Sequence, residues 1–205
     1  RWLADREPAL RTAAVDALGA LKPAGVEESL IRALSDALPA VRRAAAPALA
    51  GVASADGLIA LQNAASDPDE SVREAVVRAL SGRADGRALA ALANRVRDDS
   101  PAVRAATMTT LGSLHERRAL PLLIQGASDP DEDVQLAALV GIGELGGSAE
   151  PAVIVLLRKR LEGEPRFAKA ALAALGRLDG KPALEVLVAT LHDPELARTA
   201  QAALL

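Results

Sequence analysis

A stripe of apolar residues recurs along the whole chain. In each copy the apolar residues stand at positions 0, 3, 4, 7 and 8, a spacing that places their side chains on one face of an α-helix. A glycine or another small residue usually follows, which ends a helix or lets a neighbour approach closely. Most copies are 31 residues apart, and position 0 is occupied in turn by Leu10, Val41, Val72, Val103, Val134, Phe167 and Leu196.

Short turns with acidic residues and proline precede the stripes. Ser66 to Asp69 and Ser128 to Asp131 are two examples. An aspartate can accept hydrogen bonds from the free amides of a first helical turn, and proline is tolerated there because its missing N–H would be unpaired anyway. Each turn therefore predicts the start of a helix, which we call the second helix of its repeat.

Another amphipathic segment lies between each stripe and the next turn, and we call it the first helix of the repeat. Residues 87–96, 119–127, 151–161 and 182–191 are of this kind. No β-type alternation competes with the helical spacing. A single helix pair could not bury its own stripe, so the pattern predicts stacked antiparallel helix pairs.

Residues 114–145 resemble a HEAT repeat. They hold Arg118 to Leu123 in the first helix, the turn Ser128 to Asp131, and the run from Val134 to Gly143 in the second helix. The length resembles, more narrowly, the HEAT-like units of the phycobilin-lyase type, since other HEAT repeats have about 40 to 47 residues. The resemblance covers the whole chain. It implies an all-α fold, a right-handed α-solenoid (superhelix) of stacked antiparallel helix pairs.

The repeat count predicts one HEAT-like domain over residues 1–205, with about six helix pairs and a partial repeat at each end. Residues 1–3 have the register of the end of a first helix, and residues 202–205 fall inside a second helix. Repeat arrays need polar capping repeats at their ends. We therefore expect the chain to be part of a longer array or larger protein, or its uncapped terminal repeats to make end-to-end contacts with another chain.

Composition and charge argue against several classes of function. The 24 Lys and Arg residues face 27 Asp and Glu, and the formal net charge of −3 has the wrong sign for a nucleic-acid binder. No cysteine occurs, so thiolate metal sites and a cysteine nucleophile are excluded. No stretch approaches the roughly 18 to 20 apolar residues of a transmembrane helix. We expect no nucleic-acid partner, no membrane insertion and a cytoplasmic location.

Aspartate and arginine recur six residues apart in the first four repeats. The pairs are Asp5/Arg11, Asp36/Arg42, Asp67/Arg73 and Asp98/Arg104. By resemblance to HEAT-like proteins, these residues form a ladder that ties successive turns together. The arginine is replaced by Gln135, Ala168 and Ala197 in the later repeats. This loss, with a two-residue insertion before Phe167, predicts a change of curvature or a softer joint between residues 135 and 168.

One acidic cluster has the spacing of a calcium loop. Asp129, Asp131 and Asp133 alternate as at the start of an EF-hand, but that loop also needs glycine at its sixth position and glutamate at its twelfth. Val134 and Val140 stand there instead. Carboxylates at a helix start are also favoured by the helix dipole. We expect a capping cluster and no metal site.

Candidate catalytic groups are few. His115 and Glu116 form the one His-Glu pair, but they follow Leu114 in a loop rather than a second helix, where HEAT-like deoxyhypusine hydroxylases place the pairs that bind iron. Ser113 is close to His115, yet no strand-turn-helix elbow is predicted to activate it. We therefore expect no catalytic residue and no cofactor.

The outward positions of the second helices are the candidate binding residues. Positions 2 and 6 must point away from the buried stripe, and in HEAT-like solenoids this side lines the concave face. The candidates for binding another protein or peptide there are Arg43, Glu74, Arg78, Thr109, Leu136, Val140 and Lys169. Arg43, Glu74 and Arg78 would set charge preference, and Leu136 with Val140 would supply an apolar anchor. The alternative that these two lean onto a neighbouring repeat stays open.

The sequence thus predicts a non-catalytic scaffold for protein–protein interaction. Two alternatives remain. The resemblance to phycobilin-lyase repeats implies an accessory subunit of a lyase or of another enzyme that handles a prosthetic group. The ends of the chain favour a regulatory or assembly segment of a multidomain protein.

Overall fold

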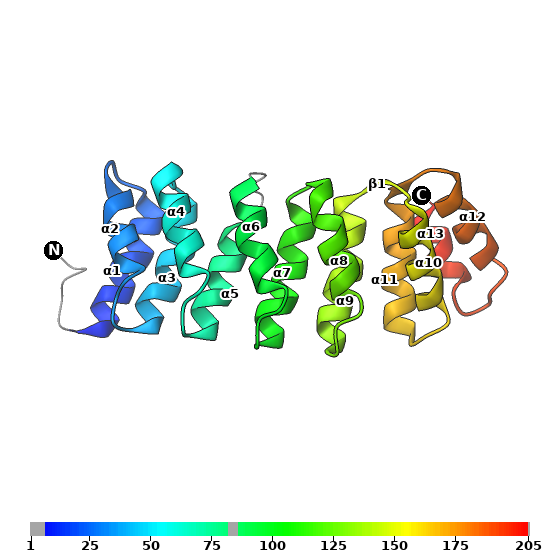
Figure 1. The fold of residues 1–205 in the computed structure, drawn as a ribbon, viewed down its shortest axis with the longest axis horizontal. Coiled ribbons are helices and arrows are strands. Elements are labelled where there is room, and N and C mark those ends of the chain that lie inside the picture. Colours follow the sequence, from blue (N-terminus) through cyan, green and yellow to red (C-terminus); the bar gives the residue numbers. More distant parts are fainter. Residues whose placement is uncertain (1–6, 82–85, 205) are drawn as a thin grey trace. The chain divides into compact units, whose positions relative to one another are not determined.

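The computed structural model describes residues 7–81 and 86–204, and these residues are almost entirely helical (Figure 1). They contain thirteen α-helices. The chain divides into two compact units, an N-terminal unit of residues 1–103 and a C-terminal unit of residues 104–205. The fold is an all-α repeat fold, as the sequence predicts.

The N-terminal unit is built from alternating first and second helices. α3 packs between α1 and α5, while α2 and α4 pack beside it. The second helices α1, α3 and α5 thus form one row, and α2, α4 and α6 belong to the other. Its helices are α1 (Pro8–Leu21), α2 (Val26–Ala33), α3 (Pro39–Ala50), α4 (Ala55–Ala64), α5 (Glu70–Ala79) and α6 (Gly86–Arg95).

The C-terminal unit repeats this arrangement. α9 packs against α8 and α11, and α11 in turn packs against α10, α12 and α13. α7, a second helix, begins three residues before the boundary between the units, and the rest of it lies in the C-terminal unit. The elements are α7 (Pro101–Ser113), the 3-10 turn η2 (Arg117–Ala119), α8 (Leu120–Gly126), α9 (Glu132–Leu145), β1 (Gly147–Ser148), α10 (Pro151–Leu161), α11 (Pro165–Gly176), β2 (Leu178–Asp179), α12 (Lys181–Thr190) and α13 (Ala197–Ala203).

The predicted stripe forms the core of both units. Val41, Val72 and Val134 are almost completely buried at position 0 of their helices, and Phe167 takes the same place in α11. The first and last copies differ: Leu10 has 41% of its surface exposed on α1, and Leu196 is half-buried. Each internal repeat therefore buries its stripe against its neighbours, which is what makes the stack stable.

The turns start the second helices as their residues predict. Asp69 accepts hydrogen bonds from two amides in the first turn of α5, and Asp131 does the same for α9. α1, α3 and α11 have no side-chain cap but begin with proline. A side-chain cap and an initial proline can replace each other, because the cap bonds an amide that has no partner inside the helix and proline has no amide N–H there.

Two short strands were not predicted. β1 and β2 pair in parallel, with Gly147 beside Leu178 and Ser148 beside Asp179. They follow α9 and α11, so they join the loops at the ends of two successive second helices. Two residues per strand are too few to produce a period-two hydrophobic pattern, which is why the sequence showed no sign of them.

Candidate interaction surface

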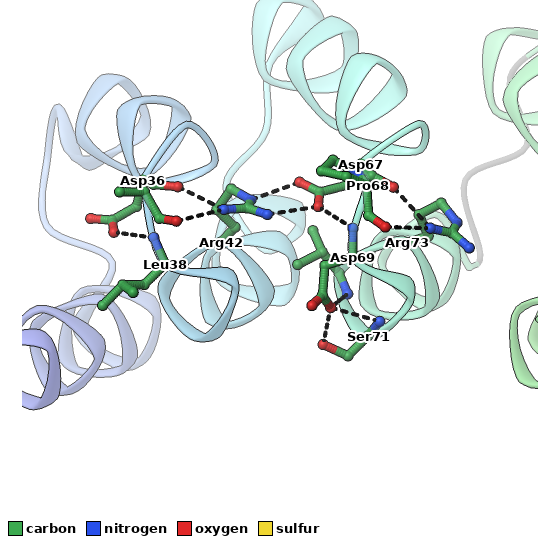
Figure 2. Close-up of polar contacts among 10 residues, drawn as sticks. Asp36, Leu38, Arg42, Asp67, Pro68, Asp69, Ser71 and Arg73 are labelled. Atoms are coloured by element: carbon green, nitrogen blue, oxygen red, sulfur yellow. Dashed lines mark hydrogen bonds and ion pairs between the residues drawn. The ribbon is translucent and has the colours of Figure 1, made fainter.

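An arginine-aspartate ladder holds the turns that support the candidate surface (Figure 2). Arg42 donates hydrogen bonds from Nε and Nη2 to the two carboxylate oxygens of Asp67 in the next repeat, at 2.7 and 2.8 Å. Its Nη1 donates to the main-chain carbonyl of Asp36 at 2.8 Å. One guanidinium thus joins two successive turns, and the predicted ladder is confirmed.

The same bidentate contact recurs in register. Arg11 binds Asp36 and Arg73 binds Asp98 in the N-terminal unit, and Arg104 binds Asp129 in the C-terminal unit; the Nε–Oδ2 distance is 2.8 Å each time. The predicted partner Asp5 lies outside the described residues. These paired side chains are mostly buried, so each rung is shielded from solvent in a way that exposed ion pairs are not.

The ladder keeps its carboxylates ionised. The hydrogen bond from Arg11 is the main cause that lowers the pKa of Asp36. For Asp67, Asp98 and Asp129, burial opposes ionisation, but hydrogen bonds from the arginine of the preceding repeat and from the main chain outweigh it and lower the pKa. The ladder therefore stabilises the fold at neutral pH, and its charged groups are already paired with one another.

The ladder ends at Gln135. Its amide Nε2 still donates to the carbonyl of Asp129, at 2.6 Å, but within residues 7–81 and 86–204 it has no hydrogen bond to a carboxylate of the next repeat. Other contacts take over in the C-terminal unit. Arg166 pairs with Glu132 and lies over the ring of Phe167, with 4.9 Å between its guanidinium carbon and the ring centre. On the same ring lies Arg160, whose Nη2 donates to the carbonyl of Ala127.

Small residues let the second helices pack closely. A Cβ added to Gly112 on α7 would lie 2.6 Å from the Cα of Gly141 on α9. A Cβ at Gly143 would lie 2.9 Å from the Cα of Ala174 on α11. These are backbone contacts that cannot move aside, so both positions require glycine. The close packing brings the outward residues of adjacent second helices onto one continuous face within each unit, which we call the second-helix face.

In the N-terminal unit the second-helix face is charged. Arg43 on α3 and Arg78 on α5 are exposed, while Glu74 is half-buried. Nη2 of Arg78 donates to Glu74 at 2.8 Å across one helical turn. Pro47 lies on the same face, and α3 continues past it to Ala50. The three predicted charged residues therefore lie on adjacent second helices, with Arg43 and Arg78 exposed and the carboxylate of Glu74 paired with Arg78.

In the C-terminal unit the second-helix face is largely apolar. Val140 is 40% exposed and Leu136, one turn earlier on α9, is half-buried. Thr109 is exposed, and its hydroxyl donates to the carbonyl of Ala105 at 3.2 Å, which leaves its methyl group to solvent. Lys169 on α11 is exposed beside them. Leu136 is thus partly covered within its own unit, whereas Val140 projects outward.

The residues considered for chemistry have structural contacts. Asp129 belongs to a ladder rung, and Asp131 caps α9. Ser113 donates its hydroxyl to the carbonyl of Thr110 at 2.9 Å. Over residues 7–81 and 86–204, no three His, Cys, Asp or Glu side chains form a group that could hold a metal ion. No helix in the same residues has the length and apolar character needed to cross a membrane.

Sequence reasoning missed a second exposed region in the C-terminal unit. A groove of about 530 Å³ opens between α10 and α12, with the apolar residues Ile154, Leu161 and Val186 among those that line it. On α12 itself, Leu184, Val188 and Leu191 are exposed. The sequence analysis placed residues 182–191 in an amphipathic first helix and did not say which of its apolar side chains are buried, because the amphipathic pattern marks an apolar face without showing what packs on it.

Comparison with known proteins supports the repeat assignment. The family model for HEAT repeats matches residues 1–81, 27–107, 58–143, 89–167 and 121–205, which together span the chain. No curated protein matches this chain.

Several solved structures are similar in fold. The complex of CpcE and CpcF of phycocyanin lyase from Nostoc sp. PCC7120 contains a chain that is 25% identical, with a TM-score of 0.62, over 99% of this chain and 90% of that one. YibA of E. coli is 18% identical, with a TM-score of 0.63, over 100% of this chain and 89% of that one. An engineered protein is 19% identical, with a TM-score of 0.64, over 99% of this chain and 66% of that one.

Proposed function

Because this chain belongs to the HEAT-repeat family, we propose that it is a non-catalytic scaffold that binds another protein or a peptide along its second-helix face. The observation that carries the proposal is the exposure of Val140 beside the half-buried Leu136 on a helix whose other side is fully packed. An apolar ridge on an otherwise polar surface is typical of an interaction site.

The contacts on this face support a division of roles. Leu136 and Val140 form the apolar anchor, because a partner side chain placed on them removes apolar surface from water. Lys169 borders this ridge in the C-terminal unit. In the N-terminal unit Arg43, Glu74 and Arg78 favour partners of complementary charge, an effect that acts mostly on specificity and association rate.

The rest of the chain's chemistry favours recognition over catalysis. The ladder carboxylates are paired with arginine, and the hydroxyl groups of Thr109 and Ser113 donate to the main chain. The net charge of −3 favours a protein partner over a nucleic acid. We expect the protein to work in the cytoplasm.

A double variant tests the apolar anchor. Leu136→Glu with Val140→Glu places two charges on the ridge, and we expect affinity capture from the native host to lose specific partners. The matched control is Val155→Glu, which alters an apolar residue that is 68% exposed on α10, away from the second-helix face. Equal recovery of the same partners by wild type, the double variant and the control would remove these residues from the proposed site.

A second candidate function is an accessory subunit of a phycobilin-lyase-like or other prosthetic-group-handling enzyme. It is favoured by the similarity to the CpcE and CpcF complex of phycocyanin lyase, at 25% identity and a TM-score of 0.62. Mixing the purified chain with a free bilin distinguishes the two functions. A red shift and induced circular dichroism of the bilin band would support the lyase function. An unchanged spectrum would count against it and leave only the scaffold function.

A further inference from the structure

Polar residues continue the second-helix face at the end of its helices in the C-terminal unit. Ser113, Glu144 and Arg177 each stand ten residues after position 0 of their repeat. In the three earlier repeats the same position holds small residues, which are Ala20, Gly51 and Gly82. The repeats that carry the apolar ridge therefore also carry a row of polar side chains beside it.

This row lines a groove within the C-terminal unit. The groove has a volume of about 560 Å³, and His115, Gly143 and Gly146 line it as well. His115 and Gly146 stand at the same repeat position and have φ values of +51° and +62°, so the chain leaves α7 and α9 in a similar way. The two glycines add no side chains, which keeps the groove open beside Glu144.

Glu144 lies on the line of the apolar ridge. Leu136, Val140 and Glu144 are spaced by four residues on α9, so they follow one another along one side of the helix. Each step of four residues advances about 6 Å along the helix axis. The ridge therefore ends in a carboxylate, roughly 12 Å along the axis from Leu136.

The fold does not use the carboxylate of Glu144. The residue is half-buried, and among the described residues its side chain has no hydrogen bond or ion pair. It lies in the last turn of α9, which contains no basic residue. The negative end of the helix dipole is also there, so an acidic side chain is unfavourable and a cation is favoured. The position suits a cationic ligand better than it suits stability.

The basic residues near the groove leave this carboxylate available. Arg117, which lies against Gly147, pairs with Glu150 at 2.6 Å. His115 and Arg177 are exposed on the border of the groove, and neither forms an ion pair with any residue in the described part of the chain. The groove thus combines an unpaired acceptor with donor groups at its edge.

We propose that the partner of the second-helix face contributes an extended segment with two apolar residues and one basic residue at alternate positions. Alternate side chains of an extended chain point to the same side and are about 6.5 Å apart, which matches the steps along α9. The two apolar side chains pack on Leu136 and Val140, and the lysine or arginine binds Glu144. This assignment rests on the proposed function of that face.

The main chain of such a segment also needs partners. An extended chain outside a sheet has N–H and C=O groups with no internal hydrogen bonds. Lys169 and Arg177 are both exposed, one near the start of α11 and the other directly after its end. Both side chains are hydrogen-bond donors only, so they suit the carbonyls of the segment. The α9 side of the groove reads side chains, and the α11 side holds the main chain.

Synthetic peptides test the segment. The probe is a short fluorescent peptide with leucine, leucine and arginine at alternate positions and serine elsewhere, made in both chain directions because the side-chain spacing is the same in each. Fluorescence anisotropy with the 205-residue chain measures the dissociation constant. We expect one direction to bind. Replacing its arginine by glutamate should weaken binding at least about tenfold, since like charges would then meet at Glu144.

Variants of Glu144 show whether this carboxylate is responsible. Glu144→Gln should weaken binding of the arginine peptide about fivefold to tenfold at unchanged helical content, because the carboxylate has no partner in the fold. Glu144→Arg should reverse the preference and favour the glutamate peptide. Glu28→Gln is the matched control, because Glu28 is an exposed glutamate of α2 in the N-terminal unit.

Three outcomes would overturn the inference. The first is that neither peptide direction binds at up to about 1 mM. The second is that the glutamate peptide binds wild type as tightly as the arginine peptide does. The third is that Glu144→Gln and Glu28→Gln bind the arginine peptide equally. If Leu136→Glu with Val140→Glu still abolished binding in the third case, the apolar ridge and the proposed function would stand and the basic residue would not.

Discussion

The two units join their repeats by different means. In the N-terminal unit, Arg11, Arg42 and Arg73 each bind an aspartate of the next repeat and so form successive rungs. In the C-terminal unit the ladder has one rung, from Arg104, and after Gln135 the repeats are held by close glycine contacts, stacking on Phe167 and the pairing of β1 with β2. The comparison teaches that loss of the ladder does not mean loss of contact between repeats.

The largest effect is expected where the C-terminal unit relies on glycine. Gly112→Val would drive a side chain into the backbone of Gly141, so the free energy of unfolding should fall by about 3 kcal/mol or more. Urea denaturation followed by circular dichroism measures this. Gly163→Ala is the control, because a Cβ there meets only the carbonyl of Arg160 at 3.6 Å. A Gly112→Val variant as stable as the control would show that α7 and α9 can separate freely.

Removing a rung should have the next largest effect. Arg42→Ala leaves the mostly buried carboxylate of Asp67 without the guanidinium that binds it. We expect the free energy of unfolding to fall by about 2 to 3 kcal/mol. Arg32→Ala removes an exposed pair with Glu28 in the same unit, and its cost should stay below about 0.5 kcal/mol. Similar denaturation midpoints for the two variants would mean that the rungs add no more than surface ion pairs do.

Acid should affect the two units unequally. The pKa values of Asp36, Asp67 and Asp98 are lowered in the folded state. The pKa of an aspartate in an unfolded chain is about 3.9. As pH falls below about 4 the unfolded chain takes up protons that the folded chain resists, so unfolding becomes easier. The stability from the rungs is complete above this range and is lost as pH drops through the folded pKa values.

Hydrogen exchange at a series of pH values can separate the units. After correction for intrinsic exchange rates, amides of α3 and α5 should lose protection at low pH before those of α11 and α12. Asp67→Asn should weaken this pH dependence, since one of the titrating groups is gone. Equal loss of protection in the two sets of helices would contradict the assignment of acid sensitivity to the ladder.

The smallest effect is expected from extending the ladder. Glu162 stands five residues before Phe167, as Asp129 stands before Val134, so Gln135→Arg places a guanidinium where a carboxylate of the next repeat is available. Because Glu162 is exposed, the free energy of unfolding should rise by no more than about 1 kcal/mol. Thermal denaturation would detect it, and adding Glu162→Gln should cancel it. A gain that survives the second substitution would show that the new arginine acts through something else.

Much of the fold was readable because local spacing and tertiary packing agree. The predicted segment 151–161 coincides with α10, and 87–96 differs from α6 by one residue at each end. The anchors Val41, Val72 and Val134 are buried as their spacing requires. The six-residue interval between Asp36 and Arg42 predicted the ladder, although the carboxylate that Arg42 binds belongs to Asp67, 25 residues further along the chain.

What the sequence did not reveal depends on neighbours in space. The pattern gives Leu120 and Leu184 the same role, and only the packing of α12 shows that one is covered and the other is exposed. The pairing of β1 with β2 uses main-chain groups, which every sequence contains. The exposure of Val140 agrees with the proposed surface, whose binding role stays a prediction, as does a change of curvature between residues 135 and 168.

The pairing of β1 with β2 also affects how this protein can change over generations. A rung is abolished when a single codon replaces its arginine or its aspartate. The link between Ser148 and Asp179 is made by peptide groups, and the amide of Ala149 donates to the carbonyl of Asp179 at 2.9 Å whatever side chains are attached. Apart from the glycines at 146, 147 and 180, where φ is +62°, +81° and +114°, this link places little demand on residue identity. Mutations can therefore accumulate around it without separating the repeats, and new surface chemistry can arise in the C-terminal unit at low risk to the fold.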